Sequence, residues 1–151
     1  MTLAWKTSWT GQECRIFREK IIVGLLKTTA MRGDAYGELN GHLLVFKPLS
    51  FWKTGTTILD IEGKTELGKI DYNWWKSSAL ITYQETAYTW NYESWTRKKW
   101  TVNGNGDSAY FLKKGFWQNE GNIEYEDIPA SIILAALYVQ NYFVRMTAAA
   151  S

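Results

Sequence analysis

The chain has 151 residues, and 16% of them are aromatic, including nine tryptophans and nine tyrosines. A chain of this length buries a real core as one domain, and 21% charged residues with only two prolines exclude a disordered chain. The formal net charge of +2 is too small to indicate nucleic-acid binding by itself. We therefore expect one globular, mainly β domain over residues 1–151.

The first third of the chain alternates short apolar runs with turn residues. These runs predict strands over residues 3–9, 13–18, 20–28, 35–40 and 42–47. The segment 21–26 is apolar on both faces, so we expect a buried or central strand there. Residues 31–34 predict a turn, and Pro48 ends the fifth strand because proline cannot donate a ladder hydrogen bond.

Aromatic corners then repeat along the chain. Trp52, Trp75, Trp95 and Trp117 are separated by 23, 20 and 22 residues, and each interval holds two strand-like runs around a polar turn. We expect these corner tryptophans to pack. The strands are predicted over residues 56–61, 65–72, 78–83, 87–93, 96–102, 108–113 and 121–126. We interpret the Gly-Asn-Gly piece within residues 103–107 as a hairpin turn and not a phosphate-binding loop, because no helix follows it.

Side chains alternate along the predicted strands with a period of two. Tyr88, Trp90 and Tyr92 point to one face, and the residues between them are polar. About twelve antiparallel strands joined by short connections favour closure into a barrel, which leaves no open edge. A barrel of that width has an interior that must be filled.

The last segment, residues 127–146, is predicted to form one strongly apolar helix. Asp127 is the expected N-cap, Pro129 is expected in the first turn, and Arg145 complements the negative end of the helix dipole. Apolar side chains cover nearly the whole circumference. The helix is therefore surrounded either by protein or by lipid.

The length and polar content of this helix favour protein over lipid as its surroundings. Its apolar run of about 17 residues is at the short limit for crossing a bilayer. The run also carries Ser131, Gln140 and Asn141, and no cluster of lysine or arginine flanks it. We favour a central hydrophobic helix inside the barrel, with a C-terminal membrane anchor on a β domain as the alternative.

A dozen antiparallel strands in hairpins, followed by one hydrophobic helix that threads the barrel, resemble the tubby C-terminal-like superfamily. This superfamily includes the tubby proteins, the phospholipid scramblases and the plant LURP-one-related proteins. Its small bacterial members are similar in their repeated Trp-Trp-Lys corners, here Trp74-Trp75-Lys76, and in an apolar ending, here 132–138 running into Asn141-Tyr142. The resemblance covers nearly the whole chain.

The resemblance implies a non-enzymatic domain. Tubby proteins bind a phosphoinositide headgroup through a cationic pocket, and scramblases associate with membranes. The headgroup-binding lysines and arginines of tubby proteins do not align with positions of this sequence, so their roles are not carried over.

A search for catalytic and metal-binding groups finds little. His42 is the only histidine, and we expect a strand residue there. Zinc sites need several histidines or cysteines, and Cys14 is the only cysteine. Four carboxylates lie close enough in sequence to supply a general acid/base pair: Glu120, Glu124, Glu126 and Asp127. However, strand alternation exposes Glu124 and Glu126 on one face, and helix capping accounts for Asp127. We therefore predict no catalytic residue, no metal site and no cofactor.

Basic residues form the most promising exposed feature. Arg97, Lys98 and Lys99 lie between two tryptophans, and Lys113 and Lys114 end the strand that pairs with theirs. In a hairpin the start of one strand faces the finish of the next, so we expect both groups at the same end of the sheet. They form either an anion or headgroup patch or a solubilised strand end.

Three function classes follow. The first is a non-enzymatic binding or scaffold domain that contacts an anionic membrane surface or a protein partner. The second is a lipocalin-like or fatty-acid-binding-like carrier, which needs an empty barrel. The third is an enzyme, for which the sequence offers no constellation; a carbohydrate-binding sandwich with tryptophan platforms is a weaker fourth. One cysteine and no apolar signal-peptide core predict a cytoplasmic location, with membrane association open.

Overall fold

The computed structural model describes residues 1–29, 33–49, 54–115 and 118–150, without the side chains of residues 149 and 150. The predicted aromatic corners at residues 51–53 and 116–117, and the first half of the predicted turn at residues 31–34, lie outside this part of the chain.

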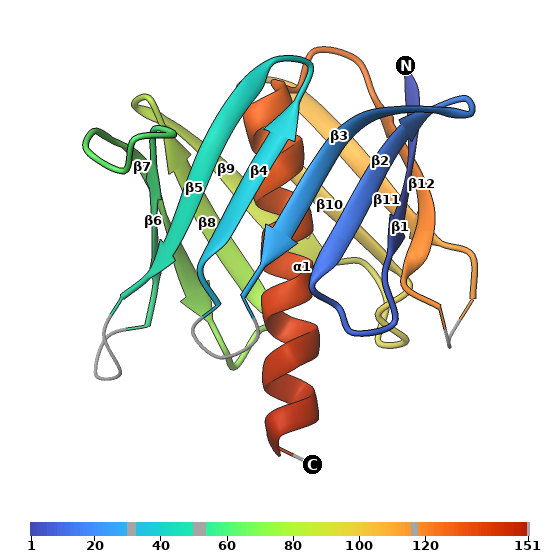
Figure 1. The fold of residues 1–151 in the computed structure, drawn as a ribbon. Helices are drawn as coiled ribbons and strands as arrows, with labels where there is room; N and C mark the ends of the chain where they lie inside the picture. The colour runs from blue at the N-terminus through green and yellow to red at the C-terminus, as the bar shows by residue number, and fades with distance from the viewer. Residues whose placement is uncertain (30–32, 50–53, 116–117, 151) are drawn as a thin grey trace.

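The described residues form twelve antiparallel strands and one helix, and the strands close into a barrel (Figure 1). Each strand pairs with its neighbours along the chain, and β1 pairs with β12 to complete the circle. The elements are β1 (Thr2–Thr7), β2 (Glu13–Arg18), β3 (Ile21–Thr28), β4 (Ala35–Leu39), β5 (His42–Pro48), β6 (Thr56–Leu59), β7 (Glu66–Asn73), β8 (Ser78–Tyr83), β9 (Thr86–Tyr92), β10 (Lys99–Gly104), β11 (Asp107–Lys113), β12 (Glu120–Tyr125) and α1 (Ala130–Ala150). The predicted barrel of about twelve strands is confirmed.

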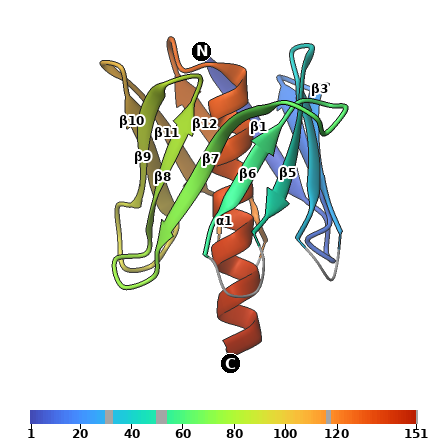
Figure 2. The same cartoon turned by 90° about the vertical axis from the view of Figure 1, so that its left-hand side faces the viewer.

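Helix α1 runs along the axis of the barrel in both views (Figures 1 and 2). Every residue from 131 to 141 is buried, so all sides of this stretch face protein. Inward-pointing strand residues such as Leu3, Trp5 and Ile16 complete the same core. The all-round apolar pattern thus marks a barrel axis, and side chains occupy the interior that a carrier would leave empty.

Among the described residues, no helix combines the length and the hydropathy that crossing a bilayer requires.

The predicted start of the helix is wrong by three residues. Helix α1 begins at Ala130, and the amides of Ile132 and Ile133 donate to the carbonyl of Pro129 at 3.0 and 3.2 Å. Proline disfavours helical backbone in the residue before it, so Asp127 lies outside the helix and does not cap it. The helix also continues past residue 146, which places Arg145 before the last turn.

The prediction of a strand buried on both faces at residues 21–26 is also wrong. Ile21 is 69% exposed and Ile22 is 54% exposed, while Leu26 is buried. A closed barrel filled by one helix has a single inner face, and the outward side chains of β3 meet solvent. Two-sided apolar character therefore does not require a second covering layer here.

Turns replace the predicted end of β6 and the predicted start of β10. Strand β6 ends at Leu59, since the Asp60 carboxylate accepts hydrogen bonds from the amides of Lys64 and Thr65 at 2.9 and 3.2 Å. These backbone donors lower the pKa of Asp60. Strand β10 begins at Lys99 and not at residue 96, because the preceding turn places Arg97 at a positive φ of 61°.

The two ends of the barrel carry different connections. Neighbouring strands run in opposite directions, so every connection from an odd-numbered to an even-numbered strand lies at one end. We call this the loop end, and the C-terminal part of α1 emerges from it (Figure 1). The opposite end, the turn end, carries the remaining connections, residue Met1 and the start of α1.

Candidate functional site

The two ends of the barrel differ in charge. Among the described residues that connect strands at the turn end or lead from β12 into α1, six are acidic (Glu19, Asp60, Glu62, Glu85, Glu126 and Asp127) and two are basic (Lys20 and Lys64). Among those that connect strands at the loop end, four are basic (Lys76, Arg97, Lys98 and Lys114) and two are acidic (Asp34 and Glu93). The barrel therefore has an acidic and a basic end.

The structure brings the five predicted basic residues to the loop end. Arg97 and Lys98 lie in the connection between β9 and β10, Lys99 begins β10, Lys113 ends β11, and Lys114 follows it. The amide of Lys113 donates to the carbonyl of Lys98 at 2.8 Å. Burial and the nearby charge of Lys98 lower the pKa of Lys113, so the cations are crowded at this rim.

Lys99 is the member of the group that is most clearly neutralised. Its ammonium lies 3.1 Å from the Glu93 carboxylate and 5.9 Å from the centre of the Tyr110 ring. The Glu93 carboxylate therefore competes with any external anion for Lys99. The predicted patch therefore rests on the other cations at this end.

Arg97 makes hydrogen bonds to two other segments of the loop end. Its Nη1 donates to the hydroxyl of Thr147 in α1 at 3.0 Å, and its Nη2 donates to the hydroxyl of Ser77 in the next loop at 3.2 Å. The guanidinium also lies 5.2 Å from the centre of the Tyr92 ring. The Arg97 amide closes the turn by donating to the carbonyl of Ser94 at 3.1 Å. Arg97 thus positions two loops and the helix.

Two of the predicted corner tryptophans, Trp75 and Trp95, are exposed, which contradicts the packing expected of them, and Trp9 at the same end is exposed too. Trp9 is 101% exposed, Trp75 is 99% exposed and Trp95 is 93% exposed. Trp74 packs against Tyr142 and Phe143 of α1, with ring centres 5.6 Å apart in each case. Side chains that face the axis reach the helix, whereas those at the tips of the hairpins lie beyond it.

Hydrogen bonds define the backbone of the loops that carry these tryptophans. In the connection between β1 and β2, the amide of Gly11 donates to the carbonyl of Ser8 at 2.9 Å. In the connection between β7 and β8, the amide of Lys76 donates to the side-chain oxygen of Asn73 at 3.2 Å. The exposed indoles therefore project from ordered turns.

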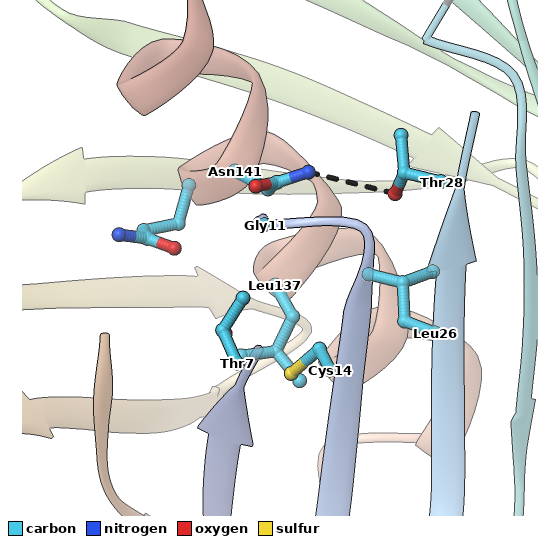
Figure 3. A pocket seen from close by; sticks show the side chains of 8 residues that line it. Thr7, Gly11, Cys14, Leu26, Thr28, Leu137 and Asn141 are labelled. Carbon is cyan, nitrogen blue, oxygen red and sulfur yellow. Dashed lines mark hydrogen bonds between the residues drawn. The ribbon is translucent and has the colours of Figure 1, made fainter. Parts of the chain in front are cut away.

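A small pocket lies inside the barrel near the loop end, between α1 and the first strands (Figure 3). Asn141 donates to the hydroxyl of Thr28 at 3.5 Å, and Gln140 accepts a hydrogen bond from Asn119 at 3.1 Å. Burial raises the pKa of the Cys14 thiol in its wall to about 12. The cavity of about 10 Å³ has room for a single water at most and is too small for a ligand. Its polar side chains instead link α1 to the wall by hydrogen bonds.

An open groove of about 430 Å³ lies near the turn end and includes Met1, Asp107, Glu124 and Glu126 in its lining. The Met1 ammonium donates to the carbonyl of Tyr125 at 2.7 Å. Across the described part of the chain, no three histidine, cysteine or acidic side chains are placed to hold a metal ion together. His42 lies in β5, as the sequence predicts.

The fold and this geometry define a class of protein, a helix-filled antiparallel barrel with one basic and aromatic end. Comparisons with protein-family models, curated proteins and solved structures find no match. Membership of the tubby C-terminal-like superfamily therefore stays a prediction from the sequence.

Proposed function

We propose that this chain is a non-enzymatic binding domain of tubby-like fold that contacts an anionic membrane surface with its loop end. The observation that carries the proposal is the opposite charge of the two barrel ends. Such a molecule is attracted to a negative surface with the loop end foremost and is repelled from it in the reverse orientation. The proposal places the protein in the cytoplasm and in reversible association with a membrane.

The filled barrel favours an external binding surface over an internal one. A carrier of the lipocalin or fatty-acid-binding type needs a cavity, and here residues 131–141 of α1 occupy the axis. Ligands must therefore bind on the outside, and the loop end is where cations and aromatic side chains gather. An acidic protein partner would use the same charges, and binding to pure lipid vesicles separates the two kinds of partner.

Vesicle sedimentation tests the proposal with two matched charge reversals. Lys76→Glu combined with Lys114→Glu changes the loop end, and Lys20→Glu combined with Lys64→Glu makes the same charge change at the turn end. All four lysines are exposed. We expect the loop-end variant to bind phosphatidylserine-containing vesicles about tenfold or more weakly, because each surface cation contributes about 1 kcal/mol. The turn-end variant should bind like the wild type.

Salt and lipid composition complete the experiment. Raising the ionic strength should weaken wild-type binding, since exposed charges are screened. Equal loss of binding in the two variants would contradict the proposal. Failure of the wild type to sediment with phosphatidylserine vesicles would reject lipid and leave the acidic protein partner.

A further inference from the structure

Three almost fully exposed tryptophans share the loop end of the barrel. Trp9, Trp75 and Trp95 lie in three different connections, between β1 and β2, β7 and β8, and β9 and β10. The connections of the turn end contain no tryptophan, and Ile61 is their most exposed large apolar side chain. Single exposed apolar residues are ordinary on protein surfaces, but this set collects the largest side chains at one end.

The spacing of the three loops fits an extended surface better than a small ligand. The β1–β2 and β9–β10 hairpins are centred four strand positions apart around the barrel. At about 4.8 Å for each position, this corresponds to about 19 Å along the wall. One sugar ring or short peptide side chain does not reach across that separation, whereas a bilayer surface is wide enough to contact three separate loops.

The chemistry around the tryptophans also suits a bilayer. Indoles prefer the boundary between headgroups and acyl chains, because the ring is apolar and its N–H finds a polar partner there. Lys76 follows Trp75 directly, and Arg97 and Lys98 follow Trp95 within three residues. On α1, Val144 and Met146 add half-exposed apolar side chains at the end of the barrel from which the helix emerges.

We infer that Trp9, Trp75 and Trp95 insert into the headgroup boundary of a phospholipid bilayer and anchor the barrel there, with the C-terminal end of α1 directed at the membrane. This inference rests on the proposed function and deepens it. The cations bring the loop end to an anionic surface, and the three indoles supply binding that does not depend on lipid charge. The turns that carry the indoles are already ordered in the free protein. Insertion therefore costs little backbone conformational entropy.

Partitioning of a triple variant tests the anchor. Trp9→Ala, Trp75→Ala and Trp95→Ala together remove the indoles, and Ile21→Ala, Ile22→Ala and Ile61→Ala together remove exposed apolar side chains elsewhere on the barrel. We expect the tryptophan variant to lose about tenfold or more of its partition coefficient into anionic vesicles at high salt. The isoleucine variant should partition like the wild type. Thermal unfolding verifies that both variants are folded.

Site-specific labelling locates the membrane contact directly. Trp95→Cys provides a thiol at the loop end, and Ile61→Cys, which also replaces an exposed apolar side chain, provides one at the turn end as a matched control. Native Cys14 stays unlabelled because it is buried and its pKa is raised to about 12. With an environment-sensitive dye, we expect brominated phospholipids to quench the label at position 95 and not the label at position 61.

The possible outcomes distinguish the anchor from the electrostatic proposal. If the tryptophan variant binds anionic vesicles as tightly as the wild type at high salt, the anchor is wrong and the proposed function stands. Absence of quenching at position 95 on vesicles that bind the protein also overturns the anchor. If the wild type binds neither anionic nor zwitterionic vesicles, both proposals fall.

Discussion

Trp90 connects the wall of the barrel to its central helix. Its indole Nε1 donates to the carbonyl of Ala136 in α1 at 3.1 Å, and both residues are fully buried. The ring also stacks near Phe143, with centres 5.3 Å apart. One side chain thus combines a hydrogen bond with aromatic packing across the interface between sheet and helix.

We predict that Trp90→Phe lowers the free energy of unfolding by about 2 to 4 kcal/mol, because it removes a buried hydrogen bond and leaves a cavity beside the helix. Urea unfolding followed by circular dichroism measures the change. Trp95→Phe is the control, since Trp95 is 93% exposed and its ring contributes little to the core. Equal unfolding midpoints for the two variants would contradict this role of Trp90.

At the scale of elements, a glycine in β4 makes room for a side chain of α1. A Cβ atom added to Gly37 in β4 would lie 3.3 Å from a side-chain carbon of Leu134 and 3.3 Å from one of Leu26. The helix and β4 therefore fit together without room for a further methyl group.

We predict that Gly37→Val lowers the free energy of unfolding by about 1 to 3 kcal/mol through overpacking. Leu134→Ala alone should lower it by about 2 to 5 kcal/mol through a cavity. In the double variant the valine fills part of that cavity, so the combined loss should be smaller than the sum. A double-mutant cycle in urea measures the coupling, and strict additivity would show that the two positions are independent.

The elements were largely predictable because their signals are local. Alternation along β9 and short connections indicate the barrel, and apolar side chains on all sides of residues 131–141 indicate its axis. The start of α1 was missed because the restriction that Pro129 places on the residue before it outweighs the capping preference of Asp127. The exposure of Ile21 was missed because hydrophobicity alone does not reveal how many faces of a strand are covered.

At the scale of the whole molecule, the two chain ends that the structure describes lie at opposite ends of the barrel. Met1 lies at the turn end, while residue 150 lies beyond the loop end (Figures 1 and 2). A protein attached near residue 150 would stand between the loop end and a membrane. One attached before Met1 would point away from it.

We predict that a folded fluorescent protein fused at the C-terminal end reduces vesicle binding at least about tenfold, because it separates the cations and indoles from the surface beyond the screening length. The same protein fused before Met1 should leave binding unchanged. Sedimentation of both fusions with phosphatidylserine vesicles compares them. Stronger inhibition by the N-terminal fusion would place the contact at the turn end.

The candidate site was predictable only in part. Antiparallel hairpins force Arg97 and Lys114 to the same end, and the sequence is sufficient for that inference. It does not show that Lys99 is paired with Glu93, because the partner comes from the far side of a turn. Nor does it distinguish Trp74, which reaches α1, from Trp75 beside it, since the direction of a hairpin tip depends on the finished barrel.

The pairing of β1 with β12 closes the wall around a helix that comes later in the chain. A helix with side chains this large cannot pass through a closed barrel, so the wall must close around α1. Closure joins residues such as Thr2 and Glu124, and long separations of this kind slow folding. We therefore expect the wall to stay open until the helix has been synthesised. During that time the unpaired edges of β1 and β12 are exposed and prone to aggregation with other chains.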